Sequence, residues 1–261
     1  MKPPLTYYGG KQKLVPYILP LIPKHNLYCE PFFGGGAVFF AKEPSRVEVI
    51  NDLDGNLITF YRVLKNNFGK LKKEIQATLY SREDHQGAKI VLGYPQLFSD
   101  VKRAWALWAL IHQGYSSMMD GTWGYERKDD TAVKRFHNKK INFIKQYAER
   151  LERVQIEHRN ALEVIQTRDT NESFFYCDPP YFNSYQKYCV YYTEEDYKKL
   201  LDVLVKIKGK FLLSSYPSEI LTEYIKKYKW HAKEIEMPVS VVARYKTGKR
   251  KTEMLIANYQ M

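Results

Sequence analysis

Apolar residues recur along the chain in two patterns, and each pattern predicts a different kind of element. Residues 27–40 predict a short strand, a glycine-rich turn and the start of an apolar helix, and the apolar run VEVIND follows them. A strand, loop, helix and strand in this order predict a parallel α/β sheet. Further apolar runs that predict strands occupy 47–52, 154–160, 174–177 and 210–216. Residues 234–259 predict two strands around a basic turn, so the sheet is expected to end in an antiparallel hairpin.

The middle of the chain shows a helical period instead. Residues 56–80 and 101–113 predict helices, and the second is apolar over most of its surface, which indicates a buried helix. Residues 114–130 carry Gly, Asp and aromatic residues without that period, so we predict a loop or a β-hairpin. A helix is expected to resume near Lys139, and a capped helix over 193–209 returns the chain to the α/β pattern.

The order of these elements predicts one α/β domain, 1–58 and 152–261, interrupted by a mostly helical insertion at 59–151. No apolar run approaches the roughly 20 residues that span a bilayer, and no signal peptide is recognisable, so we expect an intracellular protein. The three cysteines lack metal-ligand spacing. We therefore expect reduced thiols and no structural metal.

The charge of the chain indicates a binding partner. The formal net charge is +12, and residues 59–151 hold 17 Lys or Arg against 9 Asp or Glu. A second basic stretch, RYKTGKRK at 244–251, contains no acid. Two concentrated basic regions favour a polyanionic partner, nucleic acid first.

Candidate ligand-binding residues lie at the ends of predicted strands, where open α/β sheets bind their ligands. These strand ends are 30–36, Asn51 and Asp52, Asn160, and 178–181. Glycines at 34–36 allow a ligand to approach the backbone, and Asp52 follows at the spacing of an acid that binds ribose hydroxyls. The phosphate-loop and GxGxxG patterns are both absent. The sequence therefore predicts a nucleoside site without fixing the nucleoside.

The last of these strand ends, DPPY at 178–181, presents acceptors only. Two prolines fix the backbone and remove two donors, which leaves the Asp178 carboxylate and the Pro179 carbonyl exposed to a ligand. Such a pair suits an exocyclic amino group of a base, and Tyr181 offers a flat face for stacking.

Taken together, these motifs resemble a Dam-like, D12 class DNA adenine-N6 methyltransferase, and the resemblance covers most of the chain. The motifs that carry it, in the order of the family, are TYYGGKQKL, EPFFGGGAVF, VINDLDGNLI, CDPPY, KGKFLLSSY and ARYKTGKRKTEMLIANY. The resemblance implies a Rossmann-like S-adenosylmethionine-dependent methyltransferase sheet and a target-recognition domain at 59–151 with a β-hairpin. It also implies methyl transfer from S-adenosyl-L-methionine to N6 of an adenine flipped out of double-stranded DNA.

Site residues follow from matched motif positions and from the strand ends. The expected catalytic residues are Asp178, Pro179, Pro180 and Tyr181. The expected cofactor-binding residues are Tyr7, Lys11, Phe32, Gly34, Gly35, Gly36, Asp52, Asn160 and Asp178. The expected DNA-binding residues are Tyr115, Ser116, Trp123, Tyr125, Arg127, Lys128, Arg244, Lys246, Lys249 and Arg250.

The resemblance also implies a cytoplasmic monomer in a bacterial or phage-infected cell, and it leaves open a cognate restriction endonuclease as a partner. Residues 114–130 depart from the arginine-tyrosine-asparagine stretch of GATC-reading members, which leaves the recognition sequence open. Other functions stay under consideration at this point. They are an NAD-dependent oxidoreductase, a non-catalytic DNA-binding protein, and a methyltransferase for RNA adenine or for cytosine N4.

Overall fold

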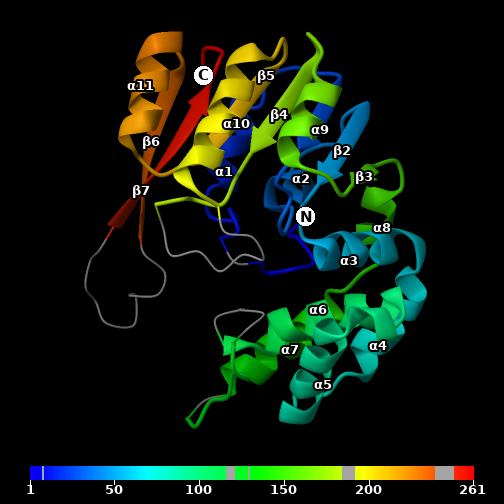
Figure 1. Ribbon diagram of the computed structural model, residues 1–261. Coiled ribbons are helices and arrows are strands. Elements are labelled where there is room, and N and C mark those ends of the chain that lie inside the picture. Colours follow the sequence, from blue (N-terminus) through cyan, green and yellow to red (C-terminus); the bar gives the residue numbers. More distant parts are fainter. Residues whose placement is uncertain (8, 116–120, 129, 184–191, 239–249) are drawn as a thin grey trace. The chain divides into compact units, whose positions relative to one another are not determined.

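A computed structural model describes residues 1–7, 9–115, 121–128, 130–183, 192–238 and 250–261. These residues form two compact units (Figure 1), each of which is described by itself. The first unit contains Met1–Val15, Phe33–Pro44 and Asp52–His158. The second unit contains Pro16–Phe32, Ser45–Asn51 and Arg159–Met261.

The strands form a seven-stranded sheet in the order β3-β2-β1-β4-β5-β7-β6. Their bounds are β1 Leu27–Glu30, β2 Val47–Asn51, β3 Gln155–Glu157, β4 Ser173–Cys177, β5 Lys210–Ser215, β6 His231–Pro238 and β7 Arg250–Ala257. β1 runs parallel to β2 and β4, and β4 runs parallel to β5, whereas β7 is antiparallel to β5 and β6. The predicted α/β sheet with an antiparallel C-terminal hairpin is confirmed.

Strand order reverses between β1 and β4, which are hydrogen-bonded neighbours although far apart in sequence. In open α/β sheets the crevice outside the carboxyl ends of the strands at such a reversal is the usual ligand site. β1 ends at Glu30, and β4 ends at Cys177, directly before Asp178. The topology therefore places Glu30 and Asp178 at this reversal point.

Helices α9 (Ala161–Arg168), α10 (Glu194–Lys206) and α11 (Glu219–Tyr228) cover one face of the second unit's strands (Figure 1). Val164, Leu200 and Leu221 of these helices share one buried cluster with apolar residues of β1, β2, β4, β5 and β7. Thr193 and Asp196 form a capping box at the start of α10, which satisfies its first backbone N–H groups. This confirms the predicted start of that helix.

The first unit is mainly helical. Its helices are α2 Ala37–Ala41, α3 Gly55–Asn66, α4 Phe68–Ala77, α5 Arg82–Gly93, α6 Asp100–Gln113, α7 Thr131–Ile141 and α8 Gln146–Leu151. Short helical turns α1 Val15–Ile18, η1 Leu19–Leu21 and η2 Pro95–Leu97 complete the described elements. α6 packs against α3, α4, α5 and α7, and Trp108 at its centre is fully buried. The predicted buried helix is confirmed.

Several element boundaries differ from the sequence prediction, two of them by more than a turn or a few residues. The helix expected to resume near Lys139 begins at Thr131 as α7, ends at Ile141, and is followed by a separate α8. Phe136 is the buried residue of α7, so the apolar period that would mark this helix is faint. The strand expected over 154–160 is shorter, since β3 ends at Glu157 and Asn160 already caps α9.

Cys29 and Cys177 are buried in the sheet, while the third cysteine, Cys189, lies outside the described residues. Among the residues described, no helix has the length and hydropathy needed to cross a bilayer.

Candidate active site

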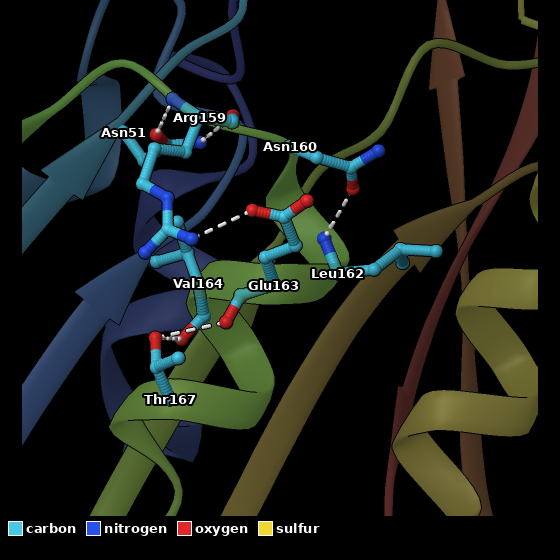
Figure 2. A network of polar contacts seen from close by, with 7 residues as sticks. All are labelled: Asn51, Arg159, Asn160, Leu162, Glu163, Val164 and Thr167. Atoms are coloured by element: carbon cyan, nitrogen blue, oxygen red, sulfur yellow. Dashed lines mark hydrogen bonds and ion pairs between the residues drawn. The ribbon is translucent and has the colours of Figure 1, made fainter.

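Asn51, at the end of β2, forms hydrogen bonds with two loops of the second unit, and Figure 2 shows its contacts with Arg159. Its side chain is fully buried, and Nδ2 donates to the Pro31 carbonyl at 2.9 Å and to the Arg159 carbonyl at 3.1 Å. The Arg159 N–H donates in return to Asn51 Oδ1 at 2.9 Å. One amide side chain therefore satisfies backbone groups of two loops and fixes their separation. The sequence marked Asn51 as a strand-end residue but assigned it no role.

Asn160 follows directly and begins α9. Its Oδ1 accepts from the Leu162 N–H at 2.9 Å, as an N-cap side chain does (Figure 2). Arg159 forms an ion pair with Glu163 one turn along at 2.8 Å. Oδ1 can still accept a second hydrogen bond, and the Nδ2 group can donate to a ligand.

The DPPY turn, residues 178–181, leaves β4 at the same edge. Pro179 is buried, whereas Asp178 and Pro180 are half-buried. The Asp178 charge reaches three neighbours, because burial first and that charge second raise the pKa of Tyr176, Cys177 and Tyr181 above their usual ranges. The turn thus holds the half-buried Asp178 among phenols and a thiol that stay protonated at neutral pH.

Tyr181 is 8% exposed, and its hydroxyl donates to Glu253 Oε2 at 2.9 Å. Its ring meets the Tyr216 ring edge-on, with centroids 4.4 Å apart. Phe32, expected to line the donor site, packs edge-on against Tyr192 with ring centroids 6.3 Å apart. The second unit therefore gathers Phe32, Asn160 and the DPPY turn at the carboxyl edge of its parallel strands.

In the first unit, the glycine loop at 33–36 has a backbone that only glycine adopts easily. Gly34 and Gly36 have φ of 50° and 68°, in the left-handed region. A Cβ at Gly36 would lie 2.5 Å from Phe33 Cζ, and Phe33 is itself held against Phe39 and Tyr61. The Tyr61 hydroxyl donates to the Gly34 carbonyl at 3.1 Å, so α3 supports the loop from below.

Asp52 is half-buried beside this loop. Its Oδ2 accepts from the Gly34 N–H at 2.8 Å, and its Oδ1 accepts from the Asp54 N–H at 2.9 Å. Burial raises the pKa of Asp52 to about 6, although the backbone N–H groups of Asp54 and Gly34 oppose the rise. Each carboxylate oxygen can accept a second hydrogen bond. Asp52 is therefore able to hold the glycine loop and a pair of hydroxyls together.

Tyr7 lies against the same loop. A Cβ at Gly35 would come within 3.1 Å of Tyr7 Cβ, and one at Gly34 within 3.5 Å of Tyr7 Cδ1. The Tyr7 hydroxyl contacts Asp54 Oδ2 at 3.4 Å, and Asp54 caps α3 by accepting from the Asn56 N–H. Lys11 Nζ donates to the Gly9 carbonyl at 3.1 Å. The structure thus brings Tyr7, the glycine loop and Asp52 together.

The structure describes six of the ten predicted DNA-binding residues, and the other four lie outside the described residues. Tyr115, Tyr125, Arg127 and Lys128 are exposed, and Trp123 is half-buried. Backbone hydrogen bonds join Tyr115 to Thr122 and Gly124 to Gln113, and Gly114 forms an antiparallel bridge with Trp123. Arg250 begins β7. The others, Ser116, Arg244, Lys246 and Lys249, lie outside the described residues.

Sequence reasoning missed Glu253, Lys251 and Tyr216, which support the DPPY turn, and Asp54 and Tyr61, which support the glycine loop. A signal for Glu253 exists, because it is an acid within the apolar run TEMLIA of a predicted strand. Such an acid needs a buried partner. Tyr61 carries no comparable signal, since an aromatic residue in a buried helix is typical of a core.

Comparisons with known proteins bear on the whole chain. It is 30% identical over 99% of its length to the type II methyltransferase M1.LlaDCHI of Lactococcus lactis subsp. cremoris, covering 96% of that protein. It is 24% identical to the DNA adenine methylase of Salmonella typhi, over 98% of this chain and 94% of that one. A solved precorrin 8w decarboxylase from Methanobacterium thermoautotrophicum aligns with a TM-score of 0.45 and 10% identity, over 100% of this chain and 96% of that one.

The model of one protein family matches residues 7–237, which is most of the chain and includes the glycine loop, Asp52 and the DPPY turn. The chain belongs to the D12 class N6 adenine-specific DNA methyltransferases.

Proposed function

We propose that the protein transfers a methyl group from S-adenosyl-L-methionine to N6 of an adenine flipped out of double-stranded DNA. The family supports methylation of adenine in DNA. The observation that carries the finer proposal is the DPPY turn at the carboxyl edge of β4, where strand order reverses and Asp178 is half-buried. A fixed acceptor pair at that edge suits an amino group better than a phosphate or a carbonyl.

The first unit offers groups that fit the nucleoside part of the methyl donor. Asp52 would accept from the ribose hydroxyls, and the glycine loop would let the donor approach the backbone. Tyr7 and Lys11 would contact the donor's amino acid end, where the lysine complements a carboxylate. In the second unit, Phe32 and the Nδ2 group of Asn160 are the residues we expect to contact the donor. When bound, the donor supplies an electrophilic methyl group on a sulfonium.

The DPPY turn would orient the target amine. The adenine amino group is conjugated with its ring, so its lone pair is a poor nucleophile until the nitrogen becomes pyramidal. Asp178 and the Pro179 carbonyl would accept its two N–H hydrogens and direct the lone pair toward the methyl group. Much of the rate would then come from positioning, since a nitrogen that gains a methyl group becomes acidic and loses its proton readily.

An adenine within a duplex cannot reach this turn, so the base must leave the stack, which costs a few kcal/mol. Tyr115 and Tyr125 are exposed and suited to contact bases or to fill the gap that is left. Trp123 would support them, because Tyr125 stacks on it with an interplanar angle of 18° and the Arg82 guanidinium lies 5.1 Å from its ring centroid. The basic residues Arg127 and Lys128, and those at 244–250, would bind phosphates.

A direct assay tests this proposal. The purified protein is incubated with unmethylated plasmid DNA and the donor, and the digested nucleosides are analysed by mass spectrometry. We expect N6-methyladenine and no N4-methylcytosine, with no product on an RNA of the same sequence. Methyl transfer to cytosine or only to RNA would contradict the proposal. Membership of the family already argues against the NAD-dependent oxidoreductase and the non-catalytic DNA-binding protein.

The affinity for the donor is expected to fall as pH falls through about 6. Asp52 has a pKa of about 6 in the free protein, and its ionised form accepts the ribose hydroxyls. Below that pH the proton must leave before binding, so Kd should rise about tenfold between pH 7.5 and pH 5. Calorimetry with S-adenosyl-L-homocysteine measures this change. Asp52→Asn should bind weakly and with little pH dependence, and an equal pH dependence in that variant would contradict the assignment.

The same pKa shift affects stability with the opposite sign. The folded state holds the Asp52 proton more tightly than the unfolded state, whose carboxyl has a pKa of 3.8. This group therefore stabilises the ligand-free fold as pH falls from about 6 toward 4. Its contribution is the difference between wild type and Asp52→Asn in thermal denaturation at several pH values.

A further inference from the structure

Four side chains at the DPPY turn form a closed ring of contacts within the second unit. Glu253 is at the centre, because its Oε2 accepts from the Tyr181 hydroxyl at 2.9 Å and its Oε1 accepts from Lys251 Nζ at 2.6 Å. Lys251 Nζ also donates to the Tyr216 hydroxyl at 3.0 Å. The Tyr216 ring returns to Tyr181 at an interplanar angle of 67°.

Both carboxylate oxygens of Glu253 thus accept a hydrogen bond, and Glu253 is buried at 2% exposure. Burial alone would lower the pKa of Lys251, but hydrogen bonds with Glu253 and Tyr216 outweigh it and raise that pKa. Burial and the charges of Asp178 and Glu253 raise the pKa of Tyr181. At neutral pH Lys251 is therefore a cation and Tyr181 a hydrogen-bond donor, so each bond of the ring has a fixed direction.

The ring also neutralises charge at the candidate active site. Burial first, and then the charges of Asp178, Glu30 and Glu253, raise the pKa of Tyr176. All three carboxylates are therefore close enough to the Tyr176 phenol for their negative charges to affect it. A charge buried with its partner removed is strongly destabilising, whereas a paired charge is tolerated. Lys251 supplies positive charge directly to Glu253 and so limits the negative field around Asp178.

Strand geometry explains how the four meet. Glu253 and Lys251 are two residues apart on β7, so their side chains lie on the same face. Ser215 of β5 pairs with Met254, which places Tyr216 beside Glu253 where β5 ends. Lys251 directly follows Arg250, the last of the basic residues predicted to bind phosphates. The ring therefore joins the base of the β6–β7 hairpin to the DPPY turn.

We propose that Glu253 and Lys251 are positioning residues for methyl transfer, which hold the Tyr181 ring in the orientation that stacks on the target base. Glu253 fixes the phenol hydroxyl, and Lys251 fixes Glu253 and the hydroxyl of Tyr216, whose ring contacts that of Tyr181. Neither residue touches the reacting atoms. The inference rests on the proposed function, and it names residues outside the DPPY motif that set how fast a bound base reacts.

A double-mutant cycle tests this inference. Tyr181→Phe removes only the hydroxyl, and Glu253→Gln keeps the volume of the side chain but removes its charge. If Glu253 acts through that hydroxyl, each variant should lower kcat on plasmid DNA about tenfold. The double variant should then be no slower than the slower single variant, and the KM for S-adenosyl-L-methionine should stay within about twofold.

Lys251 is tested in the same assay. Lys251→Met should lower kcat as Glu253→Gln does, and Lys251→Arg should recover most of the rate because it keeps the charge and the donors. If Glu253→Gln fails to fold, Lys251→Met takes its place in the cycle with Tyr181→Phe. Matched controls are Glu234→Gln and Lys233→Met on β6, whose side chains are exposed and which should retain wild-type kcat.

The outcomes separate this inference from the function on which it rests. Fully additive losses, a wild-type kcat in Glu253→Gln, or a loss of donor affinity equal to the loss of kcat would each overturn the positioning role. In all three cases a wild-type protein that methylates adenine leaves the proposed function standing. A wild-type protein that places no methyl group on DNA overturns the function itself.

Discussion

Replacing Asp178 by alanine is expected to lower the rate of methyl transfer by about 10²–10³-fold, the usual effect of losing one preorganised hydrogen-bonding group at a reacting centre. The turn would keep the Pro179 carbonyl but lose the carboxylate that accepts the second N–H hydrogen of the amine. Single-turnover transfer of a labelled methyl group to plasmid DNA measures this rate. Asp178→Asn keeps one acceptor oxygen and should fall between alanine and wild type.

Binding should survive the same substitution. Asp178 is half-buried at the end of β4, so its loss leaves the glycine loop, Asp52 and the exposed bases intact. We expect the Kd values for S-adenosyl-L-homocysteine and for DNA to stay within about threefold in calorimetry, since a group that acts mainly in the transition state changes kcat more than binding. Glu219→Ala, which removes an exposed acid from α11, serves as the control for net charge. Full activity in Asp178→Ala would remove Asp178 from the mechanism.

Replacing Gly36 by alanine should have the second-largest effect, and on donor binding. Its φ of 68° disfavours a side chain, and the new Cβ would lie 2.5 Å from the ring of Phe33. Left-handed backbone and overpacking together should cost about 2–4 kcal/mol. The ring cannot turn aside easily, because Phe33 is 3% exposed and touches Phe39, Phe40 and Tyr61. The loop should shift, and donor affinity should fall about 30-fold or more.

Gly87→Ala provides the matched control for this substitution. Gly87 lies within α5, and a Cβ there meets nothing within 4 Å. Alanine at such a position should stabilise the helix by about 0.5–1 kcal/mol and leave donor affinity unchanged. Thermal denaturation and calorimetry on the two variants distinguish a local effect on the loop from a general effect of adding a methyl group. Equal donor affinity in Gly36→Ala and wild type would show that the loop tolerates a side chain.

Sequence patterns predicted the sheet well, because its strands are apolar runs that end in polar residues. The acid after β4 and the glycines after β1 also marked the candidate site, since few structural reasons place such residues there. α7 was placed too late, because a helix that buries little beyond Phe136 leaves a weak period. A single chain also gives no register between distant strands, so nothing in it indicated that Glu253 meets Tyr181.

The residues that pack under the glycine loop could not be predicted from the sequence for a similar reason. Tyr61 and Phe33 are aromatic residues among many, and a pattern does not tell which aromatic residue lies under a given turn. Asn51 differs, because a polar residue that ends a buried strand must satisfy its amide somewhere. The Pro31 and Arg159 carbonyls that receive it are known only once the loops are placed.

The place of β7 between β5 and β6 has a consequence for the order of folding. β6 is synthesised before β7, yet it reaches the sheet only through β7. β6 therefore cannot join the sheet before β7 does. Glu253 contacts the DPPY turn only when β7 pairs with β5. Competence for catalysis should then appear late in refolding, after the parallel part of the sheet has already acquired its secondary structure.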